Sequence, residues 1–154
     1  MRQSILFFDI DGTLLSDKTG KIPDSALEAL AEAKKNGHLL FINTGRTVCA
    51  LPKELYQFEF DGYLCGCGSY LLFHEEVLLE SHIEEACGQK YIEQMRECGL
   101  DGVLEGTEDL YFPKKVSRFE KLEQGRHYFG QLGLGKKKHI EEGGFLYDKI
   151  FVYA

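Results

Sequence analysis

Two aspartates separated by a single residue give this chain its clearest chemical signal. Asp9 and Asp11 follow the apolar run Ile5–Phe8, and Gly12 comes directly after them. Side chains alternate along a strand, so acids two positions apart leave its end on the same side. The glycine permits a sharp turn there. Two carboxylates at the end of a buried strand suit a hard cation, and a carboxylate can also attack phosphorus and carry the phosphoryl group.

A calcium-binding loop also uses alternating acids, but the spacing here excludes it. Such a loop needs Gly at its sixth position and Glu at its twelfth. Counted from Asp9, those positions hold Leu14 and Gly20. A plain strand ending in an acidic turn would explain Asp9 alone. It would not explain why a second acid, Gly12 and Thr13 follow at once.

The elements around the two acids predict a parallel sheet. The segment Pro23–Lys35 opens with Pro and Asp, keeps its leucines on one face and closes with lysines, which predicts a helix. The short apolar run His38–Asn43 predicts a buried strand. Strand, helix and strand in this order predict a right-handed crossover and parallel pairing. In such sheets the functional site lies at the carboxyl ends of the strands.

A second polar motif stands at that position. Thr44, Gly45 and Arg46 follow the second predicted strand, beside the expected place of Asp9 and Asp11. A hydroxyl and the amides of a turn can hold a phosphate oxygen. Arg46 can pair bidentately with a phosphate, and a structural salt bridge is its competing interpretation.

These two motifs resemble those of a known superfamily. The run Phe7-Phe8-Asp9-Ile10-Asp11-Gly12-Thr13-Leu14-Leu15 closely resembles the first motif of the haloacid dehalogenase (HAD) superfamily, and the Thr-Gly-Arg loop resembles the second motif in its Cof-type branch, subfamily IIB. The resemblance implies a Mg2+-dependent phosphatase with Asp9 as nucleophile and Asp11 as general acid/base. It also implies that the Asp9 carboxylate and the Asp11 carbonyl bind Mg2+. The implied phosphate-binding residues are Gly12, Thr44, Gly45 and Arg46.

The resemblance also implies the fold. We expect an α/β protein with a HAD-like Rossmannoid parallel sheet in residues 1–82 and an inserted, incomplete α/β cap in residues 83–154. In the Cof-type branch such a cap selects the substrate. The remaining predicted elements are a broken helical stretch over 47–57, a strand over 62–66, a hairpin over 70–81, a helix over 83–98, strands at 103–105 and 110–112, a helix over 117–128 and a final strand over 147–153.

The chain departs from the family pattern in two places. Cys67-Gly68-Ser69 stands where Cof-type proteins commonly carry Asn-Gly and a small residue. The third-motif lysine and the acidic Gly-Asp motif normally follow the cap, and the sequence contains no Gly-Asp dipeptide. We therefore expect an amino-terminal portion of a Cof-type hydrolase. The alternatives are an inactive fragment or assembly module that keeps the fold, and a phosphomutase.

The composition of the chain limits the classes of partner that the protein is expected to bind. A chain of 154 residues with 44% hydrophobic and 28% charged residues is an ordinary globular sequence. No segment has the length of a membrane span or the form of a signal peptide. A formal charge of −7 argues against nucleic acid and anionic membranes. Five cysteines without a Cys-x-x-Cys motif predict reduced thiols in a cytoplasmic protein. The expected partner is a small phosphorylated metabolite such as a sugar phosphate, and the oligomeric state stays open.

One segment imitates a nucleotide-binding loop. Residues 130–137 nearly spell a P-loop, but a lysine replaces the final Ser or Thr that would bind magnesium. No predicted strand precedes the glycines. Nucleotide binding is therefore not expected there.

Overall fold

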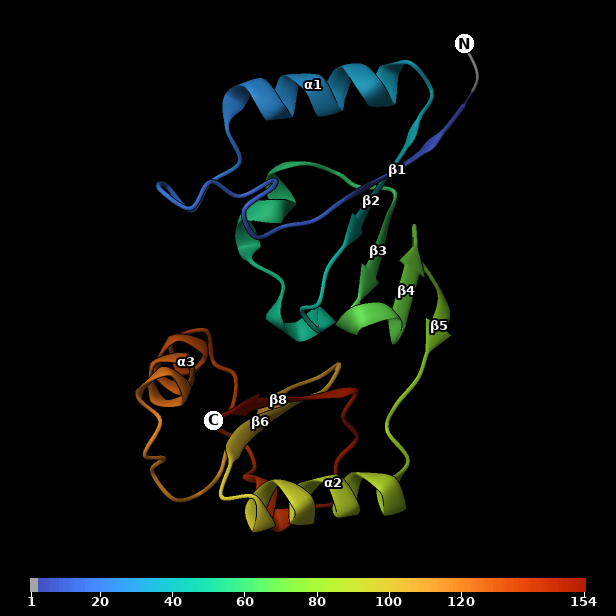
Figure 1. The fold of residues 1–154 in the computed structure, drawn as a ribbon. Coiled ribbons are helices and arrows are strands. Elements are labelled where there is room, and N and C mark those ends of the chain that lie inside the picture. The colour runs from blue at the N-terminus through green and yellow to red at the C-terminus, as the bar shows by residue number, and fades with distance from the viewer. Residues whose placement is uncertain (1–2) are drawn as a thin grey trace. The chain divides into compact units, whose positions relative to one another are not determined.

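The computed structural model describes residues 3–154, which divide into two compact units (Figure 1). Among the described residues, the first unit comprises 3–47 and Leu51–Glu80. The second comprises Val48–Ala50 and Ser81–Ala154.

The first unit is built on a five-stranded sheet. Its strands are β1 (Ile5–Phe8), β2 (Leu39–Asn43), β3 (Gly62–Cys65), β4 (Tyr70–Phe73) and β5 (Glu76–Glu80), in the order β1-β2-β3-β4-β5. Strands β1, β2 and β3 run parallel, and β4 and β5 form an antiparallel hairpin. The predicted strand, helix and strand with parallel pairing are confirmed, with Ile5 opposite Leu39.

Helix α1 (Asp24–Lys35) begins and ends as the sequence predicts. Pro23 precedes it with extended dihedrals, and Asp24 lies in the first turn, where the helix dipole favours an acid. Lys34 and Lys35 lie in the last turn. Gly37 follows with φ of 84°, a conformation that other residues rarely adopt. The crossover from β1 to β2 is thus specified by its own residues.

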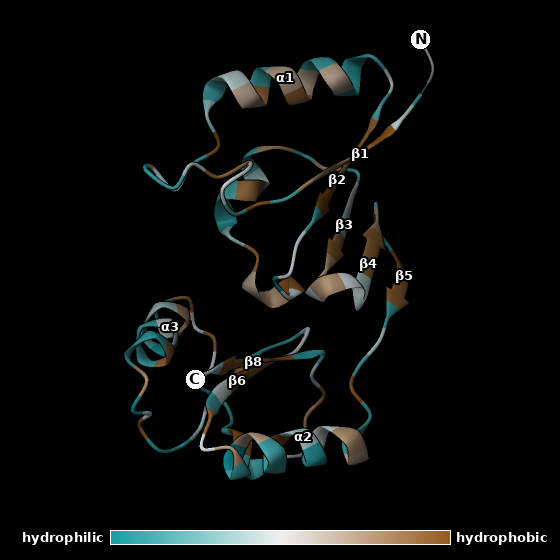
Figure 2. Cartoon of the chain, in the orientation of Figure 1, coloured by the Kyte–Doolittle hydropathy of each residue, from teal (hydrophilic) through white to brown (hydrophobic). Residues whose placement is uncertain are grey.

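The two faces of the first sheet differ in burial. Leu6 and Phe8 of β1 pack against a core that includes Leu40 and Ile42 of β2 and Leu30 of α1. On the opposite face of β1, Ile5 and Phe7 are each 54% exposed. Strand β1 is also an edge of the sheet in residues 3–154. Figure 2 shows the strands of this sheet as strongly hydrophobic.

The hairpin of β4 and β5 turns at His74 and Glu75, and Glu76 already belongs to β5. His74 takes φ of 52°, which supplies the left-handed residue that Asn-Gly usually provides. The hairpin predicted over 70–81 is confirmed.

The second unit contains a three-stranded antiparallel sheet and two helices. The strands are β6 (Asp101–Glu105), β7 (Leu110–Tyr111) and β8 (Lys149–Tyr153), in the order β7-β6-β8, and the helices are α2 (Glu85–Glu97) and α3 (Glu120–Gln131). Four short 3-10 helices complete the chain: η1 (Val48–Ala50), η2 (Lys53–Gln57), η3 (Gly66–Gly68) and η4 (Ile140–Glu142). Within residues 3–154, no helix is long and apolar enough to cross a membrane.

Helix α3 lies three residues further along the chain than predicted. Ser117 stands before the helix instead of in it, because its amide donates to Glu123 Oε1 at 2.9 Å and its hydroxyl accepts from the Phe119 amide at 3.1 Å. The final strand begins at Lys149 instead of Tyr147, which precedes the strand and packs in a buried cluster with Ile92 and Leu104. Local hydrogen bonds and packing, not periodicity, set these two boundaries.

Candidate functional site

The loop after β1 is a tight turn that leaves two acids in solvent. The amides of Thr13, Leu14 and Leu15 all donate to the Ile10 carbonyl, at 3.3, 3.1 and 2.9 Å. Ile10 and Leu14 are buried in the core of the first unit.

Gly12 has φ of 72°, so the turn needs a glycine there. Asp9 and Asp11 are exposed at the carboxyl end of β1, as the sequence predicts. The apolar residues of the motif anchor the turn, and its acids stay available for chemistry.

The loop after β2 is held by backbone hydrogen bonds on both sides. The Thr44 amide donates to the Leu64 carbonyl at 2.9 Å, and the Gly66 amide donates to the Arg46 carbonyl at 2.7 Å. The buried Thr44 hydroxyl accepts a hydrogen bond from the Arg46 amide at 3.2 Å. Because β1 and β2 are parallel neighbours, this loop and the acidic turn leave the same edge of the sheet.

An ion pair joins the two loops. Arg46 donates from Nε to Asp11 Oδ2 at 2.9 Å and from Nη2 to Asp11 Oδ1 at 2.8 Å. Hydrogen bonding to Arg46 lowers the pKa of Asp11 below its ordinary value, against an opposing effect of partial burial. Of the two interpretations of Arg46, the structure shows the salt bridge. The pairing of Arg46 with a phosphate stays a prediction.

The oxygen donors of the acidic turn suit Mg2+ in kind. This ion prefers oxygen ligands, keeps several waters and is commonly held by one or two carboxylates with substrate phosphate. The exposed carboxylates of Asp9 and Asp11 fit that description. Across residues 3–154 there is no cluster of three or more His, Cys, Asp or Glu side chains that could hold a metal ion.

Cys67 borders the second loop, and its contact with Gly45 was not foreseen from the sequence. Its amide donates to the Thr44 carbonyl at 3.3 Å, and its Sγ lies 4.0 Å from the Gly45 carbonyl oxygen. A Cβ at Gly45 would lie 3.4 Å from that sulfur, so the small residue accommodates the thiol. The only sequence signal was the departure from Asn-Gly at this position. Burial raises the pKa of the Cys65 thiol, at the end of β3, to about 12.

The glycine-rich segment over 130–137 has a structural role. Gly130 lies inside α3, and Gly135 takes φ of 70°. The Gly135 amide donates to Oδ1 of the buried Asp109 at 2.7 Å. The amide that a P-loop would offer to phosphate is thus bound to a carboxylate.

The sheet has parallel strands, with an acidic turn after β1 and a Thr-Gly-Arg loop after β2. These features define an α/β protein of the HAD-like class. The sequence matches the haloacid dehalogenase-like hydrolases over residues 6–153, and the chain belongs to that family. The resemblance to the Cof-type branch and the α/β fold that it implied are confirmed.

Three relatives illustrate the match. Pyridoxal phosphate phosphatase YbhA of Escherichia coli K12 is 36% identical over 107 residues, which are 68% of this chain and 39% of that protein. The structure of the HAD subclass IIB sugar phosphatase BT4131 has a TM-score of 0.72 and 26% identity, and the match covers 92% of this chain and 54% of that one. A structure from work on a trigonal-bipyramidal intermediate in a phosphoryl-transfer superfamily has a TM-score of 0.76 and 25% identity. That match covers 100% of this chain and 59% of the other. The chain therefore spans between two fifths and three fifths of the length of these relatives.

Proposed function

We propose that this chain carries the nucleophile of a Mg2+-dependent phosphatase that hydrolyses a small phosphomonoester, such as a sugar phosphate. The observation that carries the proposal is the acidic turn, where Asp9 and Asp11 are exposed beside the Thr44–Arg46 loop. Two of the relatives bear the names of a pyridoxal phosphate phosphatase and a sugar phosphatase, which supports a phosphomonoester as substrate.

The proposed reaction has two steps. A carboxylate oxygen of Asp9 attacks phosphorus, the bond to the leaving oxygen breaks, and Asp11 donates a proton to that oxygen. Asp11 then takes a proton from water as the water attacks the aspartyl-phosphate, which releases inorganic phosphate and restores Asp9. A positioned acid/base of this kind contributes about 10²–10⁴-fold to the rate.

Mg2+ would be held by the Asp9 carboxylate and the Asp11 backbone carbonyl, and when bound it neutralises charge on the phosphate oxygens. The Thr44 hydroxyl and the turn amides of Gly12 and Gly45 would bind the phosphate oxygens.

The ion pair suggests how Asp11 is prepared for its first task. Paired with Arg46, Asp11 has a lowered pKa and stays ionised, which opposes proton donation. A substrate phosphate offers Arg46 a second bidentate partner. When Arg46 turns to the phosphate, Asp11 loses the contact that keeps it ionised and can carry the proton that the leaving oxygen needs.

The second unit would act as the α/β cap and select the substrate, as proposed for residues 83–154. The proposal places the enzyme in the cytoplasm, where its five free cysteines stay reduced. Neither nucleic acid nor a membrane is among its proposed partners.

A second candidate is an assembly module that keeps the fold without the chemistry. One observation favours it: residues 3–154 contain no group of three or more His, Cys, Asp or Glu side chains that could hold a metal ion.

Hydrolysis of p-nitrophenyl phosphate by the 154-residue chain, with Mg2+ and with a chelator, tests the proposal. We expect metal-dependent turnover that is lost in Asp9→Asn and kept in Asp24→Asn, a matched change of an exposed acid on α1. Turnover that survives in Asp9→Asn would refute the nucleophile. A folded chain without turnover would favour the assembly module for this chain.

A further inference from the structure

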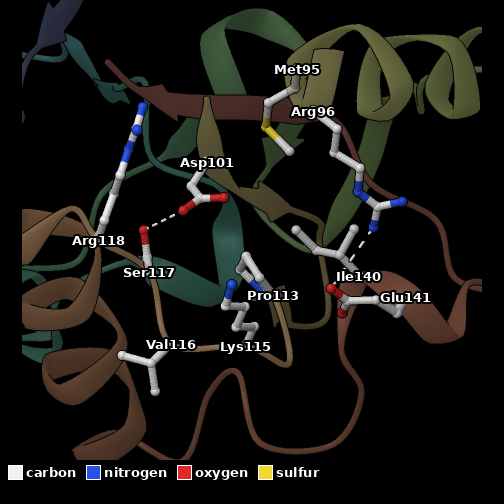
Figure 3. Close-up of a pocket in the computed structure, with 10 residues that line it drawn as sticks. All are labelled: Met95, Arg96, Asp101, Pro113, Lys115, Val116, Ser117, Arg118, Ile140 and Glu141. Carbon is white, nitrogen blue, oxygen red and sulfur yellow. Dashed lines mark hydrogen bonds and ion pairs between the residues drawn. The ribbon is translucent and has the colours of Figure 1, made fainter. Parts of the chain in front are cut away.

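The second unit contains a pocket of about 400 Å3 that is separate in its residues from the acidic turn (Figure 3). It is lined by the end of α2, the start of β6, the loop 113–118 and η4. Its volume lies within the range of small-molecule sites, about 300–1,000 Å3. None of the residues proposed for phosphate transfer lines it.

The floor of the pocket is apolar. Met95 and Ile140 are buried and line it together with Pro113. Figure 3 shows the Met95 and Ile140 side chains extending toward the centre. A ligand would gain free energy by covering this apolar surface.

Both carboxylates of the pocket already have partners. Asp101 Oδ2 accepts a hydrogen bond from the Ser117 hydroxyl at 2.5 Å. Glu141 Oε2 accepts from the Lys114 amide at 2.9 Å, and its Oε1 lies 3.8 Å from Arg96 Nη2. Each carboxylate thus accepts a hydrogen bond, and only that of Glu141 also lies near a cation.

Two of the cationic side chains of the pocket, Arg118 and Lys115, differ in the partners that they have. Arg118 donates from Nη2 to the Gly99 carbonyl at 2.7 Å and lies 4.8 Å from the centre of the Phe119 ring. These contacts fix the guanidinium but use only part of its several donors. The Lys115 ammonium has no hydrogen-bond or ion-pair partner within residues 3–154. Figure 3 shows the Arg118 guanidinium directed away from the Lys115 side chain.

We propose that this pocket binds a small organic anion, with its carboxylate or phosphate group on Lys115 and its apolar part on Met95 and Ile140. The unmatched ammonium selects an anion, and the apolar floor favours an organic anion over a bare inorganic ion. The site is independent of phosphate transfer at Asp9, so either proposal can fail without the other.

Heteronuclear NMR of the backbone amides tests the site with four probes. Benzoate and phenylphosphonate carry the two anionic groups on the same ring, benzyl alcohol carries the ring without charge, and inorganic phosphate carries charge without a ring. We expect benzoate, phenylphosphonate or both to shift the amides of Ser117, Arg118 and Ile140. The uncharged alcohol and inorganic phosphate should bind at least tenfold more weakly, since each lacks one of the two contacts.

Variants locate the anionic group. Lys115→Ala should weaken binding by about tenfold, the loss expected for one charge-assisted hydrogen bond. Lys114→Ala is the matched control, because it removes a neighbouring exposed ammonium and keeps the amide that binds Glu141. If both variants bound the probes equally weakly, the net charge of the protein would explain the effect, and the proposed site would be wrong. Shifts confined to the loops around Asp9 and Thr44, or no shifts up to the solubility limit of the probes, would also overturn the site.

Discussion

Arg46 holds Asp11 with two nearly equal hydrogen bonds, 2.8 Å from Nη2 to Oδ1 and 2.9 Å from Nε to Oδ2. The Asp11 side chain is 57% exposed and that of Arg46 is 27% exposed. An ion pair so open to water contributes about 0–1 kcal/mol to stability. The ion pair therefore affects the pKa of Asp11 more than it affects the stability of the fold.

Replacing Arg46 should raise the pKa of Asp11. Hydrogen bonding to Arg46 is the largest cause of the lowered value, so Arg46→Ala should return the pKa toward its ordinary range. Because the folded-state pKa is lowered, the pair contributes stability above the unfolded-state pKa, and that contribution is lost as pH falls through the folded-state pKa. Carboxyl NMR titration of Asp11 measures the shift. Lys35→Ala, which removes an exposed cation at the end of α1, should leave it unchanged, and an unchanged pKa in Arg46→Ala would contradict the assignment.

Thr44→Val should impair both the loop and the proposed reaction. The buried hydroxyl accepts from the Arg46 amide, and its loss should lower the free energy of unfolding by about 0.5–1.5 kcal/mol. In the active enzyme, loss of a preorganised phosphate donor should lower kcat by about 10²-fold. Urea denaturation and steady-state kinetics measure the two effects.

Thr44→Ser keeps the hydroxyl and is the control, which should retain most of the activity. Equal losses of activity in the two variants would contradict the role of the hydroxyl as the donor, because Thr44→Ser keeps it.

Asp61 should prove important for the stability of the first unit. Its buried carboxylate accepts from the Leu40 amide at 2.8 Å and lies 3.5 Å from Lys34 Nζ. Asp61→Ala leaves that amide without its partner and should cost about 1–3 kcal/mol. Asp61→Asn can still accept the hydrogen bond and should cost less.

Urea denaturation of the two variants, with the exposed Asp17→Ala as control, measures the difference. A loss in Asp61→Ala no greater than that of the control, expected within about 0.5 kcal/mol, would show that the buried hydrogen bond adds little.

Local sequence patterns were sufficient to predict most of the helices and strands, because each pattern involves only residues that are close together in the sequence. The capping sequence of α1 and the apolar runs of β1 and β2 are examples. Interactions between distant residues could not be predicted in the same way. Arg46 and Asp11 are 35 positions apart, and only the parallel pairing of their strands and the rotamer of one guanidinium bring them together.

Other misses have similar causes. Asp61 could be interpreted only as a turn residue beside Gly62, since its hydrogen bond to Leu40 depends on the folded sheet. Helix α3 begins later than predicted because Ser117 bonds to the Phe119 amide ahead of the helix and to Glu123 in its first turn. No local sequence pattern predicts the role of Asp109, whose carboxylate accepts a hydrogen bond from the Gly135 amide.

The exposed face of β1 should make this chain prone to self-association. Ile5 and Phe7 are each 54% exposed on an edge strand of the sheet in residues 3–154, and an exposed apolar edge is a template for pairing with another chain. Ile5→Thr with Phe7→Thr keeps residues that favour strands and removes most of the apolar surface. We expect a smaller associated fraction in sedimentation velocity and weaker fluorescence of a dye that binds apolar surface.

Leu132→Thr is the matched control for this pair, because Leu132 is 51% exposed but follows α3 in the second unit. It should change neither measurement by a comparable amount. The double variant also loses the contact of the Phe7 ring with Phe41, whose centres lie 5.4 Å apart, so a modest fall in stability of about 0.5–1.5 kcal/mol is expected. Association that falls equally in Leu132→Thr, or that persists in the double variant at unchanged secondary structure, would show that the surface responsible lies elsewhere than on β1.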